Sequence, residues 1–468
     1  MDSDWMVIRS RTSRVRRLCG QLDCEIINNP RFIDDEVFIA LNQPPKPEPL
    51  FTRLVTIEWR NFWPVSHMLL RVAAGPSVLH LSFPDFTERF HDDLFSDMGE
   101  ECTDTLSNLA TLYPSVTSFN LINPPSMPVL VPRLSAAVDC WPNLVSLTCG
   151  ELLPDVTHRL LYLPSLRSLT IRLPENIYQG ESGADAGTTD QPATATLRYL
   201  HLTGDPEDTV RFLTKFPQKL LTHTLVLKTQ VAESPTELLP LFEGVSTMFS
   251  PQHLEAITWF GDADVREFED SDTSHYHVAW FLQPAMTFHS IEPLLAFDNL
   301  VSVELQTCRS ISLCDADLEQ MGRCWKHLRS LMLGSQRGWD SLNELPTVFG
   351  LATLIELLPD LETLAISLNG YQLSSMDDEE IDTLRARCSQ ASRSLRSLDL
   401  LDTMFDESAT IAAKAIAAVV PEACEVDAWN PRSFGIQERY GYEFVSQYQL
   451  EWARVDERLK MLRAGYDI

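Results

Sequence analysis

Leu328-Arg-Ser-Leu331-Met-Leu333 is the most informative run of this sequence, because its pattern of apolar-x-x-apolar-x-apolar recurs along the chain. Clear copies of this phrase start at Leu144, Leu166, Leu361 and Leu395, and weaker copies start at Leu54, Val78, Val116, Leu197, Thr222, Leu254 and Leu300. The twelve starts are about 31 residues apart on average, which is a typical period for a repeat protein. The sequence is therefore interpreted as a repeat array and not as a series of unrelated domains.

The phrase has the pattern of a short strand with one buried side. Its fourth and sixth residues alternate with their neighbours, so two side chains point to one face and the residues between them point to the other. Helical patterns separate the phrases, most clearly at 315–325, 347–358, 379–389 and 407–420, and Ser234-Pro235-Thr236-Glu237 is a capping box at a helix start.

A single unit of this kind cannot fold alone. Ordering its backbone costs roughly 30 to 60 kcal/mol, whereas three buried leucines return about 5 to 9 kcal/mol. The units must therefore stack and share a core. We predict an α/β fold, a leucine-rich-repeat solenoid (horseshoe) with a parallel sheet on the concave face and helices on the convex face.

The repeats depart from the usual leucine-rich-repeat signature. Only Cys308 and Asn369 stand where such repeats place Asn or Cys. The spacing varies from 22 residues between Leu144 and Leu166 to 46 residues between Leu254 and Leu300. Insertions are therefore expected to leave the solenoid as loops.

The two ends of the chain differ from the array. Residues 1–49 are predicted to be an N-terminal cap with an early strand at 15–18, a helix at 34–41 and a stiff connector that contains Pro44, Pro45, Pro47 and Pro49. Residues 50–430 form the predicted solenoid of about 12 irregular repeats. Residues 431–468 end in an amphipathic helix, roughly 442–462, that we expect to cap the last repeat.

Composition and charge exclude several classes of protein. With 37 basic and 66 acidic residues among 468, the formal net charge is −29. Such a chain repels phosphate backbones and anionic lipid, so neither nucleic acid nor a membrane is an expected partner. The start of the chain lacks a signal peptide, no N-x-Ser/Thr sequon occurs, and the ten cysteines form no CxxC pair. We expect an intracellular protein with reduced thiols, cytoplasmic or nuclear.

The second half of the chain carries a family resemblance. Ile311 to Leu318, Cys324-Trp325-Lys-His-Leu328 to Leu333, Pro346 to Leu351 and Leu358 to Leu364 resemble the repeat region of fungal F-box/leucine-rich-repeat proteins. Asp4-Trp5 and the segment 14–18 resemble the part that follows the F-box in that family. The resemblance implies a substrate-recognition subunit of a cullin-RING ubiquitin ligase. The F-box itself, which binds a Skp-type adaptor, has no counterpart in this sequence, so that partner is expected only if an F-box lies upstream.

Catalytic motifs are missing from the sequence. There is no GxGxxG, Walker loop, HExxH or GxSxG. The run 262–267 starts like a calcium loop but lacks its glycine, and His275 with His277 has no fixed third ligand. We therefore expect no enzyme, no catalytic residues, no metal and no cofactor. A hydrolase or metalloenzyme built on the insertion at 260–298 is the alternative from another class.

Acidic runs at 92–104, 262–272 and 377–380 each fall in a predicted loop. They are interpreted as solvated loops that keep an apolar solenoid soluble, with attraction of a basic partner as the alternative.

A second charge pattern appears when residues are sorted by their place in the phrase. Residues 164–230 hold seven basic and seven acidic residues, so the rest of the chain carries the whole net charge. Basic side chains in this region are expected between the buried leucines on the concave face. We predict that a basic stripe binds an acidic or phosphorylated segment of a partner protein through Arg167, Arg172, Arg198, His201 and Lys228. Charge compensation within the fold is the other interpretation.

These observations favour a non-catalytic protein-binding module. Together with the family resemblance, they favour a substrate-recognition protein of a cullin-RING ubiquitin ligase that is similar to F-box/leucine-rich-repeat proteins but lacks the F-box. The alternative within this class is a stand-alone leucine-rich-repeat scaffold or regulator with no ubiquitin role.

Overall fold

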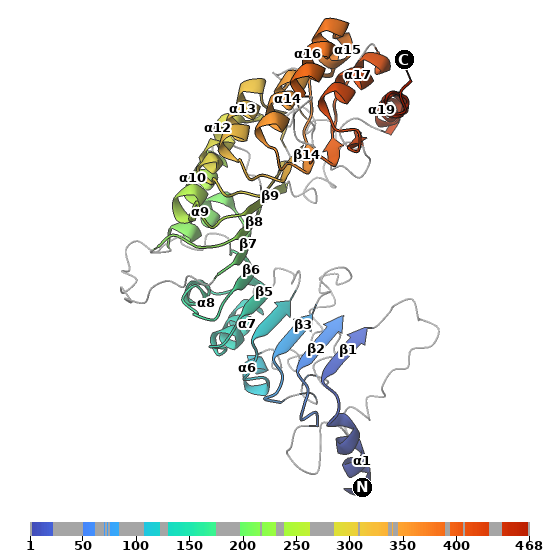
Figure 1. Cartoon of the computed structure of the whole chain (residues 1–468). Helices are drawn as coiled ribbons and strands as arrows, with labels where there is room; N and C mark the ends of the chain where they lie inside the picture. Colours follow the sequence, from blue (N-terminus) through green and yellow to red (C-terminus); the bar gives the residue numbers. More distant parts are fainter. Residues whose placement is uncertain are drawn as a thin grey trace, which may run out of the picture. The chain divides into compact units, whose positions relative to one another are not determined.

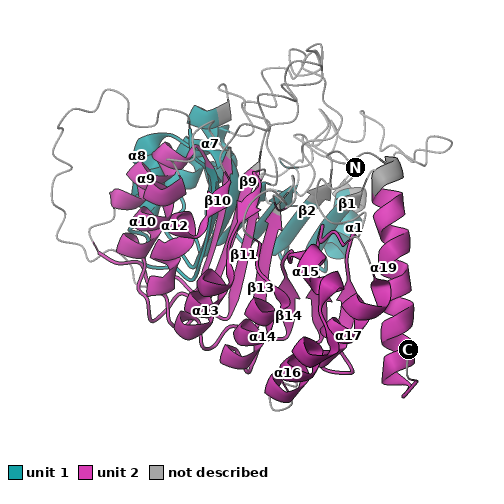
Figure 2. Cartoon of the chain, turned by 90° about the horizontal axis from the view of Figure 1, so that it is seen from above, with its two compact units in different colours: residues 1–203 teal, residues 204–468 magenta. Residues whose placement is uncertain are grey.

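The fold is an α/β array of parallel strands and helices, seen in a computed structural model of the chain (Figure 1). The structure describes residues 2–21, 50–60, 70, 73, 75–83, 107–121, 130–174, 197–215, 218–230, 238–262, 285–307, 309–335, 339, 345–388, 394–405, 408–429 and 442–466. The chain divides into two compact units, Met1–Thr203 (unit 1) and Gly204–Ile468 (unit 2), which Figure 2 colours separately.

Parallel strands in sequence order form the sheet of each unit. Unit 1 has β1 (Arg17–Gln21), β2 (Thr56–Arg60), β3 (His80–Phe83), β4 (Ser118–Leu121), β5 (Ser146–Glu151), β6 (Ser168–Arg172) and all but the last residue of β7 (Tyr199–Gly204). Unit 2 has β8 (Thr224–Gln230), β9 (Ala256–Asp262), β11 (Ser302–Thr307), β13 (Ser330–Ser335), β14 (Thr363–Ala365), β15 (Ser397–Asp399) and β16 (Glu425–Asp427). Two short strands, β10 (Met286–Thr287) and β12 (Ile311–Ser312), pair separately in unit 2. This order is that of a leucine-rich-repeat array, as predicted.

The repeat phrase places the strands correctly. Each of the twelve predicted phrases contains a strand that begins two residues after the phrase does: Leu54 precedes β2, for example, and Leu395 precedes β15. The early strand predicted at 15–18 is β1, shifted by two residues. The sequence analysis missed β16 (Glu425–Asp427), because Val426 and the flanking residues Cys424 and Ala428, which alternate there, include no leucine.

Buried leucines in register link successive repeats. In unit 1 Leu147 is the strand partner of Leu169, and both side chains are 0% exposed. In unit 2 Leu331 is the partner of Leu364, which is in turn the partner of Leu398, again with no exposure. The fourth residue of the phrase therefore forms a buried row within each unit. A single solenoid over residues 50–430 stays a prediction.

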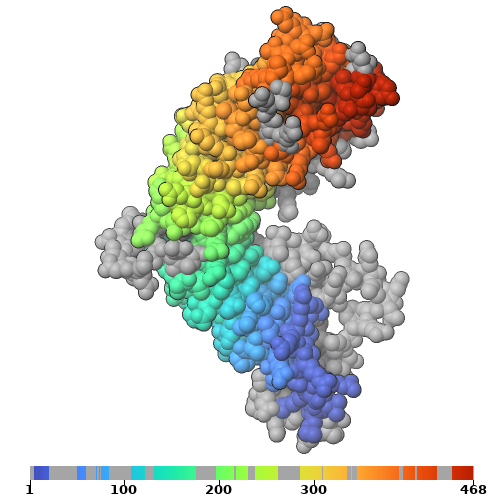
Figure 3. Space-filling view, viewed as in Figure 1, coloured from blue at the N-terminus to red at the C-terminus, as the bar shows by residue number. Residues whose placement is uncertain are grey.

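Helices connect the strands. Unit 1 contains α1 (Asp2–Thr12), α6 (Leu109–Leu112), α7 (Leu130–Asp139) and α8 (Pro154–Leu160). Unit 2 contains α9 (Pro206–Thr214), α10 (Leu238–Met248), α12 (Phe288–Ile291), the 3-10 helix η4 (Glu292–Ala296), α13 (Asp315–Cys324), α14 (Val348–Leu357), α15 (Gly370–Ser375), α16 (Asp378–Cys388), α17 (Ala409–Val419) and α19 (Tyr442–Arg463). In unit 2, α9, α10, α13 and α14 lie along one face of the strands (Figure 2), and Figure 3 shows their side as a continuous surface.

The predicted helices agree with this arrangement. The ranges 315–325, 347–358, 379–389 and 407–420 correspond to α13, α14, α16 and α17, and 442–462 corresponds to α19. The last of these packs on α17 and buries Val445, Trp452, Val455 and Leu459. The sequence analysis missed α1, while the predicted helix at 34–41 and the capping box at 234–237 lie outside the described residues.

One acidic run is a helix start and not a loop. The Asp377 carboxylate accepts a hydrogen bond from the Glu380 backbone N–H at 2.8 Å, and Glu380 accepts one from the Asp377 N–H at 3.1 Å. This reciprocal cap begins α16, where carboxylates also favour the positive end of the helix dipole. The loop prediction for 377–380 was wrong for this reason. The other two acidic runs lie almost wholly outside the described residues.

Asn369 does not play the usual part of a repeat asparagine. Its side chain caps α15 by accepting a hydrogen bond from the Gln372 N–H at 3.2 Å, and its own N–H bonds to the Pro346 carbonyl at 2.8 Å. Cys308, the other residue at this position, is outside the described residues.

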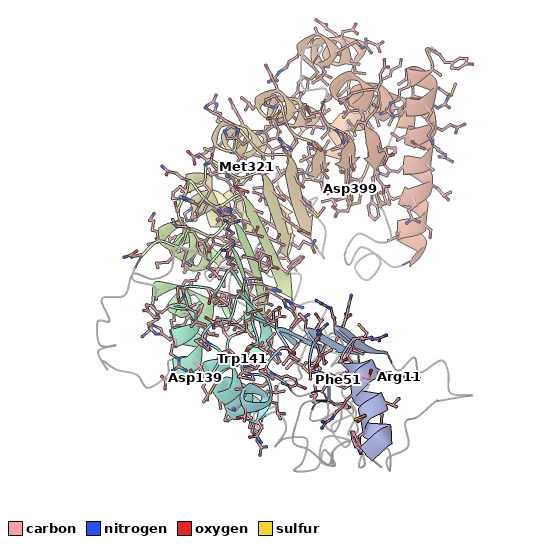
Figure 4. All side chains as sticks on the ribbon, turned by 60° about the horizontal axis from the view of Figure 1, so that its bottom comes forward. Arg11, Phe51, Asp139, Trp141, Met321 and Asp399 are labelled. Carbon is pink, nitrogen blue, oxygen red and sulfur yellow. The ribbon has the colours of Figure 1, made fainter. Side chains whose placement is uncertain are left out.

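A polar aromatic residue three positions before the phrase ties some repeats to the preceding one. Trp141 donates its indole N–H to the Tyr113 carbonyl at 3.0 Å, and Trp325 donates to the Leu294 carbonyl at 3.2 Å. Tyr113 stands at the same position and bonds the Leu70 carbonyl through its hydroxyl. These side chains are almost completely buried, and Figure 4 labels Trp141 in unit 1.

Among the described residues, no helix combines the length and the apolar character that crossing a membrane requires.

Candidate functional site

The candidate site is the sheet face that carries the side chains alternating with the buried leucines. These side chains are the third and fifth residues of each phrase and the residue directly after it, which we count as the seventh position. In the phrase that starts at Leu328 they are Ser330, Met332 and Gly334. We call this surface the open face of each unit. Parallel strands place the same phrase position of successive repeats side by side, about 4.8 Å apart.

Two of the predicted binding residues lie together on the open face of unit 1. Arg172 is the strand partner of Thr203, and His201 is the partner of Thr170. They therefore occupy diagonal positions on adjacent strands. The Arg172 Nε lies 3.7 Å from the Glu151 carboxylate on β5, which partly neutralises it. The charge of Arg172 is therefore partly compensated within the fold, as the alternative interpretation of the basic stripe expects.

Arg167 and Arg198 lie at the other end of the same strands. They are the second residues of their phrases, immediately before β6 and β7, and both are exposed. The Arg198 N–H donates to the Arg167 carbonyl at 2.8 Å, so the two residues are adjacent. Arg172 stands five positions after Arg167, which is about 16 Å along a strand.

The predicted stripe is therefore not one row. It consists of Arg167 with Arg198 at the start of two strands, Arg172 with His201 farther along them, and Lys228 on β8 in unit 2. The sequence analysis grouped all basic residues that lie between leucines and could not separate these sets. Arg167 and Arg198, at the second position, precede their strands, whereas Arg172, at the seventh position, is the last residue of β6.

The sequence analysis missed the hydroxyl-rich character of the open face in unit 1. Ser118, Ser146 and Ser168 are strand partners in the third phrase position. Asn120 and Thr148 pair in the fifth position, and the Asn120 amide donates to the Ser82 hydroxyl at 3.2 Å. Next to this row lies Tyr199, whose pKa is raised by partial burial. The pattern was visible in the third and fifth residues of the phrases.

The open face of unit 2 has a different character. Its fifth-position row runs through Glu304, Met332, Ala365, Asp399 and Asp427 on consecutive strands. Lys228 is the seventh-position residue on β8, in register with Phe260 and then with Gln306. Figure 4 labels Asp399 on its strand and Met321 on the helical side. Acidic groups therefore lie toward β16, and Lys228 lies toward β8.

Metal-binding and nucleophilic chemistry has little support in the described part of the chain. No group of three or more His, Cys, Asp or Glu side chains there could hold a metal ion. Residues 263–267, His275 and His277 lie outside that part. Burial raises the pKa of the Cys149 thiol, and it raises that of Cys424 to about 11, so both stay protonated at neutral pH and are poor nucleophiles.

Comparisons with known proteins identify no family. No family model matches the chain, and no curated protein matches it. Among solved structures, the chain is similar to one described as the crystal structure of the Rad7 and Elc1 complex in yeast, with 13% identity, a TM-score of 0.34, and coverage of 91% of this chain and 92% of that chain. A TM-score this low supports no conclusion about function. The strand order and the buried leucine rows show that each unit is a leucine-rich-repeat array.

Proposed function

We propose that the chain is a non-catalytic protein-binding module that holds its partner on the open faces. The observation that carries this proposal is the in-register arrangement of half-buried polar side chains on successive strands, from Ser118 through Ser146 to Ser168 in unit 1. An extended segment that crosses such strands meets a new side chain about every 4.8 Å. Repeat proteins use this regularity to build wide binding surfaces.

Within this class we assign the chain the role of a substrate-recognition component of a cullin-RING ubiquitin ligase. The support is the resemblance of its repeat phrases to fungal F-box/leucine-rich-repeat proteins. A stand-alone scaffold or regulator is the second candidate. The genomic sequence upstream of the Met1 codon separates the two: an in-frame F-box there supports the ligase role. If that region encodes none and the chain co-expressed with a Skp-type adaptor elutes separately from it in size-exclusion chromatography, the scaffold is favoured.

The proposed partner segment is acidic or phosphorylated and contacts the basic groups of Arg167, Arg172, Arg198, His201 and Lys228. Charge-assisted hydrogen bonds from arginine to carboxylate or phosphate are roughly twice as strong as neutral ones. Since the groups lie about 16 Å apart along the strands in unit 1, each is expected to contact a different part of the partner.

The first testable prediction concerns these groups in a pull-down from extract of cells that encode the protein. Arg172→Glu with Arg198→Glu is expected to reduce partner capture at least about tenfold at low salt, because both contacts become repulsive. Arg385→Glu with Arg454→Glu is the matched control, since these exposed arginines lie on α16 and α19. Circular dichroism must show that both variants are folded. Equal capture by the two variants would contradict the basic site.

A further inference from the structure

The residues directly before and at the start of the strands form a continuous row along one edge of the unit 1 sheet. Each is the second residue of its phrase, and Arg16 stands at the same place before β1. From the second member on, each donates its backbone N–H to the carbonyl of the preceding member, at 2.7 to 2.9 Å. Neighbours in the row are therefore about 4.8 Å apart. We call this the edge row of unit 1, and it consists of Arg16, Val55, Leu79, Thr117, Val145, Arg167 and Arg198.

The edge row has an apolar centre and cationic ends. Three of its four central residues are apolar, of which Val145 is 38% exposed and the other two are half-buried. Arg16 at one end and Arg167 with Arg198 at the other end are exposed. Within the described part of the chain, none of these three guanidinium groups has a side-chain hydrogen bond or an ion pair.

The turns that lead into these strands carry no carboxylate. Residues 13–17, 51–56, 75–80, 113–118, 140–146, 163–168 and 197–199 contain six arginines and no Asp or Glu. In the whole chain, by contrast, acidic residues exceed basic ones by 29. The strand-start edge of unit 1 is therefore a local cationic surface on an acidic protein.

The corresponding row of unit 2 is compensated internally. Its members are His223, Glu255, Val301, Arg329, Glu362, Arg396 and Glu425. The His223 Nδ1 lies 3.9 Å from the Glu255 carboxylate, and the Arg329 guanidinium lies 3.9 Å from the Glu362 carboxylate. Opposite charges on adjacent strands attract each other, so this row has its counter-charges within the fold. The row of unit 1 has none among its own members.

We propose that the edge row of unit 1 binds an extended protein segment with the pattern acidic-x-apolar-x-apolar-x-apolar-x-acidic. In an extended chain, side chains on one face recur about every 6.7 Å, so the first and ninth residues are about 27 Å apart. Arg16 is five strand spacings from Arg167 and six from Arg198, which is about 24 Å and about 29 Å. The ninth residue therefore reaches both arginines when the first contacts Arg16, and arginine is well suited to bind carboxylates. The three apolar residues of the segment then lie over the apolar centre.

The apolar centre favours a peptide over a nucleic acid. A phosphate backbone would place charges over Val55, Leu79 and Val145, where the row offers no cation, and a charge that loses water without a partner is unfavourable. Apolar side chains instead remove this surface from water. The inference rests on the proposed protein-binding function, and it assigns the acidic segment to the edge row without the basic residues farther along the strands or in unit 2.

The test measures fluorescence polarisation of labelled ligands, capped at both ends, with the full chain in low salt. The probe Gly-Asp-Ser-Leu-Ser-Leu-Ser-Leu-Ser-Asp-Gly is compared with Gly-Leu-Ser-Asp-Ser-Leu-Ser-Asp-Ser-Leu-Gly, which has the same composition and charge. A peptide with lysine in place of both aspartates and a single-stranded oligothymidylate complete the set. The chain is expected to bind the probe at least about fivefold more tightly than each of the others, because only the probe has its carboxylates at the spacing of the arginines.

Matched variants locate the binding. Arg16→Gln with Arg167→Gln is expected to weaken probe binding about tenfold or more, because it removes a cation at each end of the row. Arg329→Gln with Arg396→Gln is the control, since it removes the same charge from exposed residues at the same phrase position in unit 2 and is expected to change nothing. Thermal melts followed by circular dichroism check that both variants are folded.

A second pair of variants tests the apolar centre. Val145→Ser is expected to weaken probe binding about two- to threefold, because it removes exposed apolar surface that the probe covers. Val301→Ser changes the residue at the same phrase position in unit 2 and is expected to leave probe binding as it is.

The inference is overturned if the probe does not bind, if the rearranged peptide or the oligothymidylate binds as tightly as the probe, or if the two arginine variants bind the probe equally. Capture of a partner from extract by the wild-type chain and equally by Arg16→Gln with Arg167→Gln removes only this site and leaves the protein-binding function in place. Failure of the wild-type chain to capture any partner would instead remove the function on which the site rests.

Discussion

At the scale of single residues, one carboxylate joins two neighbouring repeats of unit 2. Asp315, the first residue of α13, accepts hydrogen bonds from both the backbone N–H and the hydroxyl of Thr347, each at 2.6 Å. Thr347 in turn caps α14 by accepting from the N–H groups of Phe349 and Gly350. This arrangement leaves no room at Gly350, where a Cβ would lie 2.1 Å from the Asp315 Oδ1.

Gly350→Ala is therefore expected to destabilise the protein by about 1 to 3 kcal/mol, although alanine is the better helix former. Gly244→Ala is the matched control within α10, because its Cβ would make ordinary contacts of 3.5 Å with Val210. That variant is expected to gain up to about 1 kcal/mol. Urea denaturation measures both. Equal stability of the two variants would show that Asp315 moves aside at little cost.

At the scale of elements, a polar aromatic residue three positions before the phrase joins some repeats to the preceding one. Trp141 contributes an indole hydrogen bond to the Tyr113 carbonyl and a ring contact with Phe119, with centroids 5.3 Å apart. Trp325 repeats the hydrogen bond in unit 2. Strand pairing joins consecutive repeats only within the sheet, whereas this hydrogen bond joins them outside it.

Trp141→Phe is expected to lower the free energy of unfolding by about 1 to 3 kcal/mol, because it leaves the Tyr113 carbonyl without its donor and opens a small cavity. Trp325→Phe is expected to have a similar effect. Tyr371→Phe, at a side chain that is 49% exposed, serves as the control and should change stability by less than about 0.5 kcal/mol. Denaturant melts compare the three. No loss at either tryptophan would argue against this fastening role.

At the scale of the whole molecule, net charge opposes folding. The formal charge of −29 makes the folded chain repel itself more than the expanded unfolded chain does. Several exposed ion pairs, such as Arg387 with Glu356 at 2.9 Å, act in the opposite direction but contribute little each. The excess of acidic residues is therefore expected to dominate the response to salt.

Raising NaCl from about 20 mM to about 300 mM, which shortens the Debye length from roughly 20 Å to roughly 6 Å, is expected to raise the melting temperature by about 2 to 5 °C. Thermal melts followed by circular dichroism measure this change. KCl at equal ionic strength is the control and should give the same rise, since the effect is screening and not cation binding. A constant or falling melting temperature would mean that the ion pairs outweigh the net repulsion.

Local patterns in the sequence were enough to locate the strands of the twelve phrases and the main helices. The alternation of residues from Leu328 to Leu333 indicates a strand, and the periodicity of residues 315–325 indicates a helix. Both signals can be recognised because they are local. For the same reason β16 was missed, since Glu425 to Asp427 carry no leucine pattern and form their strand by pairing with β15.

Which side chains lie together follows from the tertiary structure and could not be predicted from the sequence. It separates Arg167 from Arg172 at opposite ends of one strand, and it places Glu304 in one row with Asp399, ninety-five residues later in the chain. It likewise leaves the Gln306 Oε1 without a donor and brings Asp315 against Gly350. The physical reason is that these neighbours depend on the register between strands and the packing between helices, which join residues about one or more repeat lengths apart and leave no trace in a local pattern.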